Sequence, residues 1–183
     1  MTTYQAYFFE TFDALFKCSK FFCELSEQHY YKQEREKNRK LLNFIKMKIT
    51  QIKITPDNYE PFRLAQGHRV GDLLFISGQT AIDDNGKIIG IGDFDAQAQK
   101  AFENLDKVLK AGGSSLKNVV KVTIMLRDMN NFEKIVVLRG KYFTPPYPAD
   151  TILEVSSLFS PNALIEIEAI AVADEVADWE GNN

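Results

Sequence analysis

Two glutamates near the end of the chain are of a type and spacing that could carry out acid–base chemistry. Glu166 and Glu168 alternate with isoleucines in the run Ile-Glu-Ile-Glu-Ala. A carboxylate can take a proton from water and pass one to a leaving group, and such general acid–base catalysis accelerates reactions by about 10²- to 10⁴-fold. The same alternation is typical of a strand with one face in solvent, where neither carboxylate has a catalytic role. The spacing by itself favours this second interpretation.

Two other positions place special groups on predicted strands. Gly78 interrupts the run Leu-Leu-Phe-Ile-Ser-Gly-Gln, and a glycine inside a strand marks a bulge or the close approach of another group. Asp150 and Thr151 follow a Pro-Ala pair where another β-type run begins. They place a charge and a hydroxyl at a defined point of the sheet.

The elements that must position these residues follow from the apolar periodicity. The predicted strands span residues 48–55, 62–67, 72–80, 119–126, 151–158 and 163–173. Two amphipathic helices are predicted at 93–111, where Asp93 is a good N-cap and Gly112 a stop, and at 131–143, before Pro145. This order predicts an α+β fold in which a sheet carries two helices on one face.

The opposite face of such a sheet needs a cover of its own. Isoleucine and valine alternate along residues 119–126 and 163–173, and on the helix-free face they would form a large exposed apolar patch. A closed assembly of identical chains would bury that patch. We therefore expect a homo-oligomer.

Residues 1–46 differ from the rest of the chain. They contain no Gly or Pro, yet they hold seven of the fourteen Phe and four of the seven Tyr. Apolar residues recur at helical spacing between residues 4 and 16, and a charged helix is predicted at 27–44. Two interpretations stay open: a helical N-terminal extension that docks a partner, or a natural start at Met47. Residues 47–173 form the predicted domain, and 174–183 an acidic tail.

Composition excludes several classes of function. The formal net charge is −3 and the one basic run, at residues 32–40, is short, so neither nucleic acid nor an acidic membrane surface is indicated as a partner. No apolar run reaches the ~18 residues of a membrane span. Cys18 and Cys23 lie outside the predicted domain and make neither a disulfide framework nor a convincing metal site. We expect a cytoplasmic protein without a metal or an organic cofactor.

The sequence resembles the RidA family (YjgF/YER057c/UK114), the reactive intermediate or imine deaminases. The resemblance covers residues 47–173 and is carried by the stretches 69–79, 93–111, 121–128, 131–143 and 145–173, in family order. It implies a chorismate-mutase-like, six-stranded mixed sheet with two helices on one face. It also implies homotrimers whose ligand clefts lie between subunits.

The resemblance assigns roles to particular residues. In the family, an arginine after Pro-Ala binds the substrate carboxylate, and a glutamate on the last strand positions water to hydrolyse an enamine or imine to a keto acid and ammonia. Glu166 matches that glutamate. Gly78 matches the corner that lines the cleft, and Thr151 is also retained.

The sequence departs from the family at the ligand. Asp150 stands in place of the arginine and cannot offer the paired N–H groups that recognise a carboxylate. Leu64 replaces a cleft tyrosine, Val136 a helix asparagine and Ile152 a cysteine. Arg139, Arg63 or Arg69 could restore a cation, although arginines on helices and loops are usually solvated.

Three functional hypotheses follow. The preferred one is a RidA-like protein that binds a small metabolite between subunits, with deaminase activity weak or absent. The second is a hydrolase that uses Glu166 on a carboxylate-free imine or enamine, with Asp150 recognising an amine. The third is a trimeric scaffold whose N-terminal helices bind a partner. In the first two, Asp150 and Glu166 are expected to line one cleft that repels carboxylates.

Overall fold

The computed structural model describes residues 31–38 and 47–178. The chain divides into two compact units, Met1–Met47 and Lys48–Asn183, and each is described by itself. In the first unit residues 31–38 are helical and mostly exposed, which agrees with this part of the helix predicted at 27–44. The aromatic helix predicted between residues 4 and 16 lies outside the described residues. No helix in the described ranges is long and apolar enough to cross a membrane.

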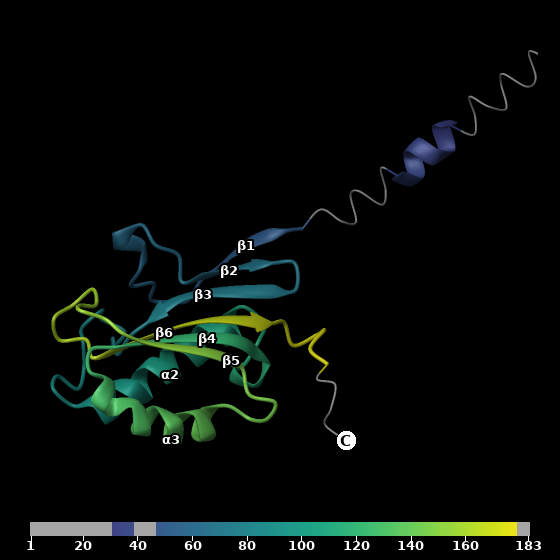
Figure 1. Cartoon of the computed structure of the whole chain (residues 1–183). Helices are drawn as coiled ribbons and strands as arrows, with labels where there is room; N and C mark the ends of the chain where they lie inside the picture. The colour runs from purple at the N-terminus through teal and green to yellow at the C-terminus, as the bar shows by residue number, and fades with distance from the viewer. Residues whose placement is uncertain (1–30, 39–46, 179–183) are drawn as a thin grey trace, which may run out of the picture. The chain divides into compact units, whose positions relative to one another are not determined.

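The second unit is built on one sheet of six strands (Figure 1). The strands are β1 (Ile49–Ile52), β2 (Gly67–Val70), β3 (Leu73–Gln79), β4 (Val119–Leu126), β5 (Ala149–Glu154) and β6 (Ile165–Val172). Their spatial order is β1-β2-β3-β6-β4-β5. Only β4 and β5 run parallel, and all other neighbours are antiparallel. The predicted six-stranded mixed sheet is confirmed.

Two α-helices cover one face of this sheet, as predicted: α2 (Phe94–Ala111) and α3 (Phe132–Tyr142) (Figure 1). The Asp93 carboxylate accepts a hydrogen bond from the Ala96 backbone N–H at 3.1 Å, which caps the first turn of α2. The α2 helix ends at Gly112. Three short 3₁₀ helices, Glu60–Phe62, Leu116–Asn118 and Met129–Asn131, complete the elements.

The core lies between the helices and the sheet. Phe102 of α2 is fully buried; its ring stacks on Tyr142 at 4.3 Å and meets Phe143 edge-on at 5.7 Å. These contacts join both helices and the chain that follows α3. Burying apolar surface contributes about 25 cal/mol per Å², so this cluster is a main source of the stability of the domain.

The second predicted strand is displaced. It was expected at residues 62–67, whereas β2 spans Gly67–Val70. The 3₁₀ helix Glu60–Phe62 and the left-handed backbone of Arg63 (φ 58°) keep the chain turning. Residues 62–66 therefore lie outside the sheet, and only Gly67 of the predicted strand belongs to β2.

The two faces of the sheet also differ from the prediction. The isoleucine and valine side chains of β4 and of the first half of β6 point toward the helices and are buried: Val122, Ile124, Ile165 and Ile167. The helix-free face carries the alternate residues, which are Lys121, Thr123, Met125, Glu166, Glu168, Ile170 and Val172. Its apolar side chains therefore include the predicted Ile170 and Val172, together with Leu73, Phe75 and Leu153, which are 41%, 44% and 47% exposed. The helix-free face is mixed rather than uniformly apolar.

We expect a chain that begins at Met47 to fold by itself. Among the described residues, the buried apolar cluster lies entirely between Ile52 and Ala173. Removing residues 1–46 should therefore lower the midpoint of thermal unfolding by less than about 4 °C, the shift that about 1 kcal/mol causes in a domain of this size. Calorimetry of the two chains measures it. A larger fall, or aggregation of the short chain, would show that the N-terminal residues cover core surface.

Candidate functional site

Glu166 lies on the helix-free face, opposite Met125 of β4. A Cβ atom at Gly78 would overlap the Glu166 carboxylate, so a larger residue at this position would force the Glu166 side chain to move. The pairing of β3 with β6 shifts register between Ile76 and Gln79, which confirms the irregularity predicted at Gly78. The structure therefore brings together two of the predicted site residues.

Tyr59 is a third member of this group. Its hydroxyl donates a hydrogen bond to the Gly78 carbonyl at 2.5 Å. Burial raises the pKa of the Tyr59 phenol, and the nearby Glu166 and Asp57 carboxylates raise it further. The phenol therefore stays protonated beside Glu166 at neutral pH.

Sequence reasoning missed Tyr59 because it sought the cleft tyrosine at Leu64. The Leu64 backbone N–H donates to the Tyr59 carbonyl at 3.2 Å, which closes the loop between the two positions. Leu64 itself is 57% exposed and lines a depression together with Arg63 and His68. The sequence feature that could have identified Tyr59 is the presence of a tyrosine in the turn before a predicted strand.

Burial also changes the acidity of Glu166. The side chain is half-buried, and desolvation raises the pKa of its carboxyl, with a further contribution from the charge of Glu168. A carboxylate with a raised pKa is a stronger base than a solvated one. Within the group formed by Tyr59, Gly78 and Glu166, the Glu166 carboxylate is therefore the candidate base.

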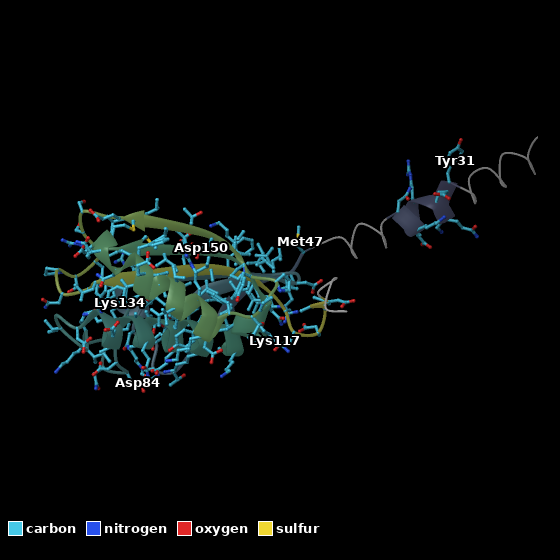
Figure 2. All side chains as sticks on the ribbon, turned by 60° about the horizontal axis from the view of Figure 1, so that its bottom comes forward. Tyr31, Met47, Asp84, Lys117, Lys134 and Asp150 are labelled. Atoms are coloured by element: carbon cyan, nitrogen blue, oxygen red, sulfur yellow. The ribbon has the colours of Figure 1, made fainter. Side chains whose placement is uncertain are left out.

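Asp150 lies on the other face of the sheet. It pairs in register with Val122, whose side chain is buried under the helices, so the Asp150 side chain points toward α3. Figure 2 labels Asp150 in the view that brings α3 to the front. The Arg139 Nε donates to Asp150 Oδ2 at 2.6 Å, and the two side chains are only 25% and 18% exposed. Arg139, which was considered as a replacement cation for the site, is thus paired with Asp150.

This ion pair lies in a pocket of about 520 Å³ between α3 and β5. The lining residues are Val136, Arg139, Gly140, Phe143, Tyr147, Pro148, Asp150 and Ile152. The pocket brings together Val136, Arg139 and Asp150, three residues predicted for the ligand site. Ile152, where the resemblance places the cysteine of some family members, also lines the pocket.

The predicted site residues therefore form two groups on opposite faces of the sheet. Within one chain β5 turns Asp150 to the helix face whereas β6 turns Glu166 away from it. The expectation that both line one cleft between subunits therefore stays a prediction. Thr151 is on the helix-free face, where its hydroxyl accepts a hydrogen bond from Lys121 Nζ at 2.7 Å. Arg69 is engaged elsewhere, with Glu175 and the Gly71 carbonyl. Residues 31–38 and 47–178 contain no cluster of three or more His, Cys, Asp or Glu side chains that could hold a metal ion.

The fold is that of the RidA/YjgF class of α+β proteins, as solved structures show. Yeast YEO7 superposes with a TM-score of 0.60 at 29% identity, over 69% of this chain and 99% of that one. RidA from an Antarctic Psychrobacter superposes with a TM-score of 0.56 at 32% identity, over 60% of this chain and 87% of that one.

The family model named Endoribonuclease L-PSP matches residues 57–173, and the chain belongs to this family. A RutC family protein of Pyrococcus horikoshii is 43% identical over 107 residues, 58% of this chain and 84% of that protein. The 2-iminobutanoate/2-iminopropanoate deaminase of the mite Dermatophagoides farinae is 32% identical over 127 residues, 69% of this chain and 97% of that protein.

The raised pKa of Glu166 predicts a pH-dependent effect on stability. The folded state holds this proton more tightly than the unfolded state, so the folded state loses relative stability as the pH rises through the folded pKa. Glu166→Gln cannot ionise and should melt a few degrees above the wild type near pH 8, with the gain disappearing below about pH 4. Thermal unfolding across this range measures the difference. Glu133→Gln, on an exposed position of α3, is the control, and an equal gain at every pH would contradict the assignment.

Proposed function

We propose that this protein binds a small metabolite in a cleft completed by a second copy of the chain, and that it hydrolyses imines derived from amino acids weakly or not at all. The observation that carries the proposal is the ion pair between Arg139 and Asp150 in the pocket of about 520 Å³. The resemblance implies that, in deaminases of the family, an arginine at the position of Asp150 binds the substrate carboxylate. Here the guanidinium already has a carboxylate partner from its own chain.

The charges of this pair disfavour a carboxylate ligand. A ligand carboxylate ~4 Å from the Arg139 guanidinium gains about 4 kcal/mol at an effective dielectric constant of 20, and about 3 kcal/mol is lost if Asp150 lies ~6 Å away. The remaining ~1 kcal/mol is smaller than the cost of removing the ligand charge from water, which is several kcal/mol per ion. Amino-acid-derived imines carry such a carboxylate and should bind poorly.

A second copy of the chain is needed to combine the two groups of residues. Glu166 and Asp150 lie on opposite faces of one sheet, so a ligand can meet both only if a neighbouring chain supplies one of them. The exposed apolar residues Leu73 and Phe75 on the helix-free face support a packing surface there. The resemblance favours a trimer for this assembly.

A second candidate function is the hydrolysis of imines through Glu166. Its support is the half-buried carboxylate beside Tyr59 and Gly78. Glu166 would take a proton from water as the water oxygen attacks the C=N carbon and pass it to the imine nitrogen, which gives a carbinolamine. The carboxylate would then move the remaining hydroxyl proton to the same nitrogen, so that the C–N bond breaks, the C=O bond forms and ammonia leaves. A relative from Mus musculus, 36% identical over 108 residues, is named a 2-iminobutanoate/2-iminopropanoate deaminase.

An assay of keto-acid release distinguishes these two functions. 2-Iminobutanoate is generated in situ from threonine by a dehydratase, and release of 2-oxobutanoate is followed with and without the protein. The wild type should accelerate release less than about twofold, because general acid–base catalysis of at least ~10²-fold requires a bound substrate. The mouse deaminase is the positive control. A large acceleration that Glu166→Gln abolishes would favour the hydrolase and reject the weak-activity proposal.

The proposed assembly predicts a definite mass. Light scattering should give three times the 20.9 kDa of one chain. Phe75→Glu, on the helix-free face, should dissociate the assembly, because it places a charge in the contact. Val137→Glu on α3, where Val137 is 72% exposed, is the matched control and should leave the mass unchanged. A wild-type monomer at micromolar concentration would remove the shared cleft.

A further inference from the structure

The Arg139–Asp150 pair retains hydrogen-bonding groups that it does not use internally. In the part of the chain from residue 47 to 178, the guanidinium and the carboxylate share a single hydrogen bond, from Nε to Oδ2. The terminal amino groups of Arg139 and the second oxygen of Asp150 are therefore available to a ligand. The pair offers donors and an acceptor side by side.

Two contacts hold this arrangement in place before a ligand arrives. The guanidinium carbon of Arg139 lies 5.8 Å from the centre of the Phe132 ring, within the range of a cation–π contact. The Asp150 side chain, only 18% exposed, receives the Nε hydrogen bond. A recognition group that is already ordered loses little entropy when it binds.

The rest of the pocket is mainly apolar. Val136, Phe143 and Ile152 contribute aliphatic and aromatic walls, and Pro148 lies beside them. Tyr147, 60% exposed, stands at the border of the pocket. These walls suit a short branched hydrocarbon group, and the ion pair must recognise whatever polar group that hydrocarbon carries.

A primary carboxamide matches the polar groups of the pair. Its carbonyl oxygen can accept from an Arg139 N–H, while its own N–H donates to the free oxygen of Asp150. A carboxylate ligand would face Asp150 with like charge, and an ammonium ligand would face Arg139 with like charge. Each of these charged ligands also loses its hydration.

We propose that this pocket selects a small, neutral aliphatic carboxamide over the corresponding acid and amine. The inference rests on the proposed small-molecule site and specifies its ligand. It replaces the amine preference expected from Asp150 alone, because Arg139 cancels the charge of Asp150.

Three probes of the same shape test the proposal on the full chain at pH 7: isovaleramide, isovalerate and isopentylamine. Saturation-transfer NMR gives their dissociation constants even when binding is weak. The wild type should bind isovaleramide at least about tenfold more tightly than the other two, the ratio that ~1.4 kcal/mol of selectivity produces.

Two conservative substitutions should invert the selectivity. Asp150→Asn leaves the Arg139 charge unopposed, so isovalerate should become the preferred probe. Arg139→Gln leaves the Asp150 charge unopposed, so isopentylamine should become preferred. Val137→Ala, on an exposed position of α3, is the control and should keep the wild-type order. The two opposite inversions cannot both arise from a general loss of folding.

The outcomes separate this inference from the proposed function. If the wild type prefers isovalerate or isopentylamine, the carboxamide inference is wrong and the small-molecule site stands. If the wild type prefers isovaleramide but neither substitution changes the order, another part of the protein makes the selection and the inference is wrong. If no probe binds at concentrations up to about 10 mM, a dissociation free energy below ~3 kcal/mol, both the inference and the proposed site are wrong.

Discussion

The two-residue repeat of a β-strand decides which surface each polar side chain of this protein reaches. Glu166 and Glu168 sit at alternate positions of β6 between isoleucines that are buried against the helices. Their carboxylates consequently lie on the face that no helix covers. On β5 the register with β4 has the opposite effect, because it aligns Asp150 with the buried Val122. Both groups of candidate site residues follow from this alternation.

The same constraint explains how an acidic residue can occupy the end of β5 without remaining an isolated charge. A half-buried carboxylate is costly unless it is paired. The α3 helix crosses the same face and presents Arg139 to Asp150 at 2.6 Å. The aspartate on the strand is therefore paired with an arginine on the helix. The charge of the pocket is balanced, although its hydrogen-bonding pattern differs from that of a single arginine.

Local patterns in the sequence predicted most of the fold. The apolar periodicity and the capping residue Asp93 predicted α2, and alternation predicted β4 and β6 with shifts of two residues or fewer at their ends. The predicted position of the second strand was wrong, because the chain turns at Arg63 in a left-handed conformation. Glycine usually occupies such a position, so the arginine gave no sign of the turn. The prediction also missed Tyr59, because its hydrogen bond to Gly78 joins positions 19 residues apart through the packing of a loop on the sheet. The Arg139–Asp150 pair depends on where a helix crosses a strand, which periodicity does not specify.

All the lining residues of the α3–β5 pocket come from one continuous stretch of chain, between Val136 and Ile152. The residues around Glu166 come from segments far apart in the sequence, since Tyr59, Gly78 and Glu166 belong to the loop before β2, to β3 and to β6. The two surfaces are therefore open to genetic change in different ways. A recombination event that replaces a few dozen codons can exchange the whole pocket at once. The group of Tyr59, Gly78 and Glu166 can change only together with the sheet, because its members come from three separate parts of the chain.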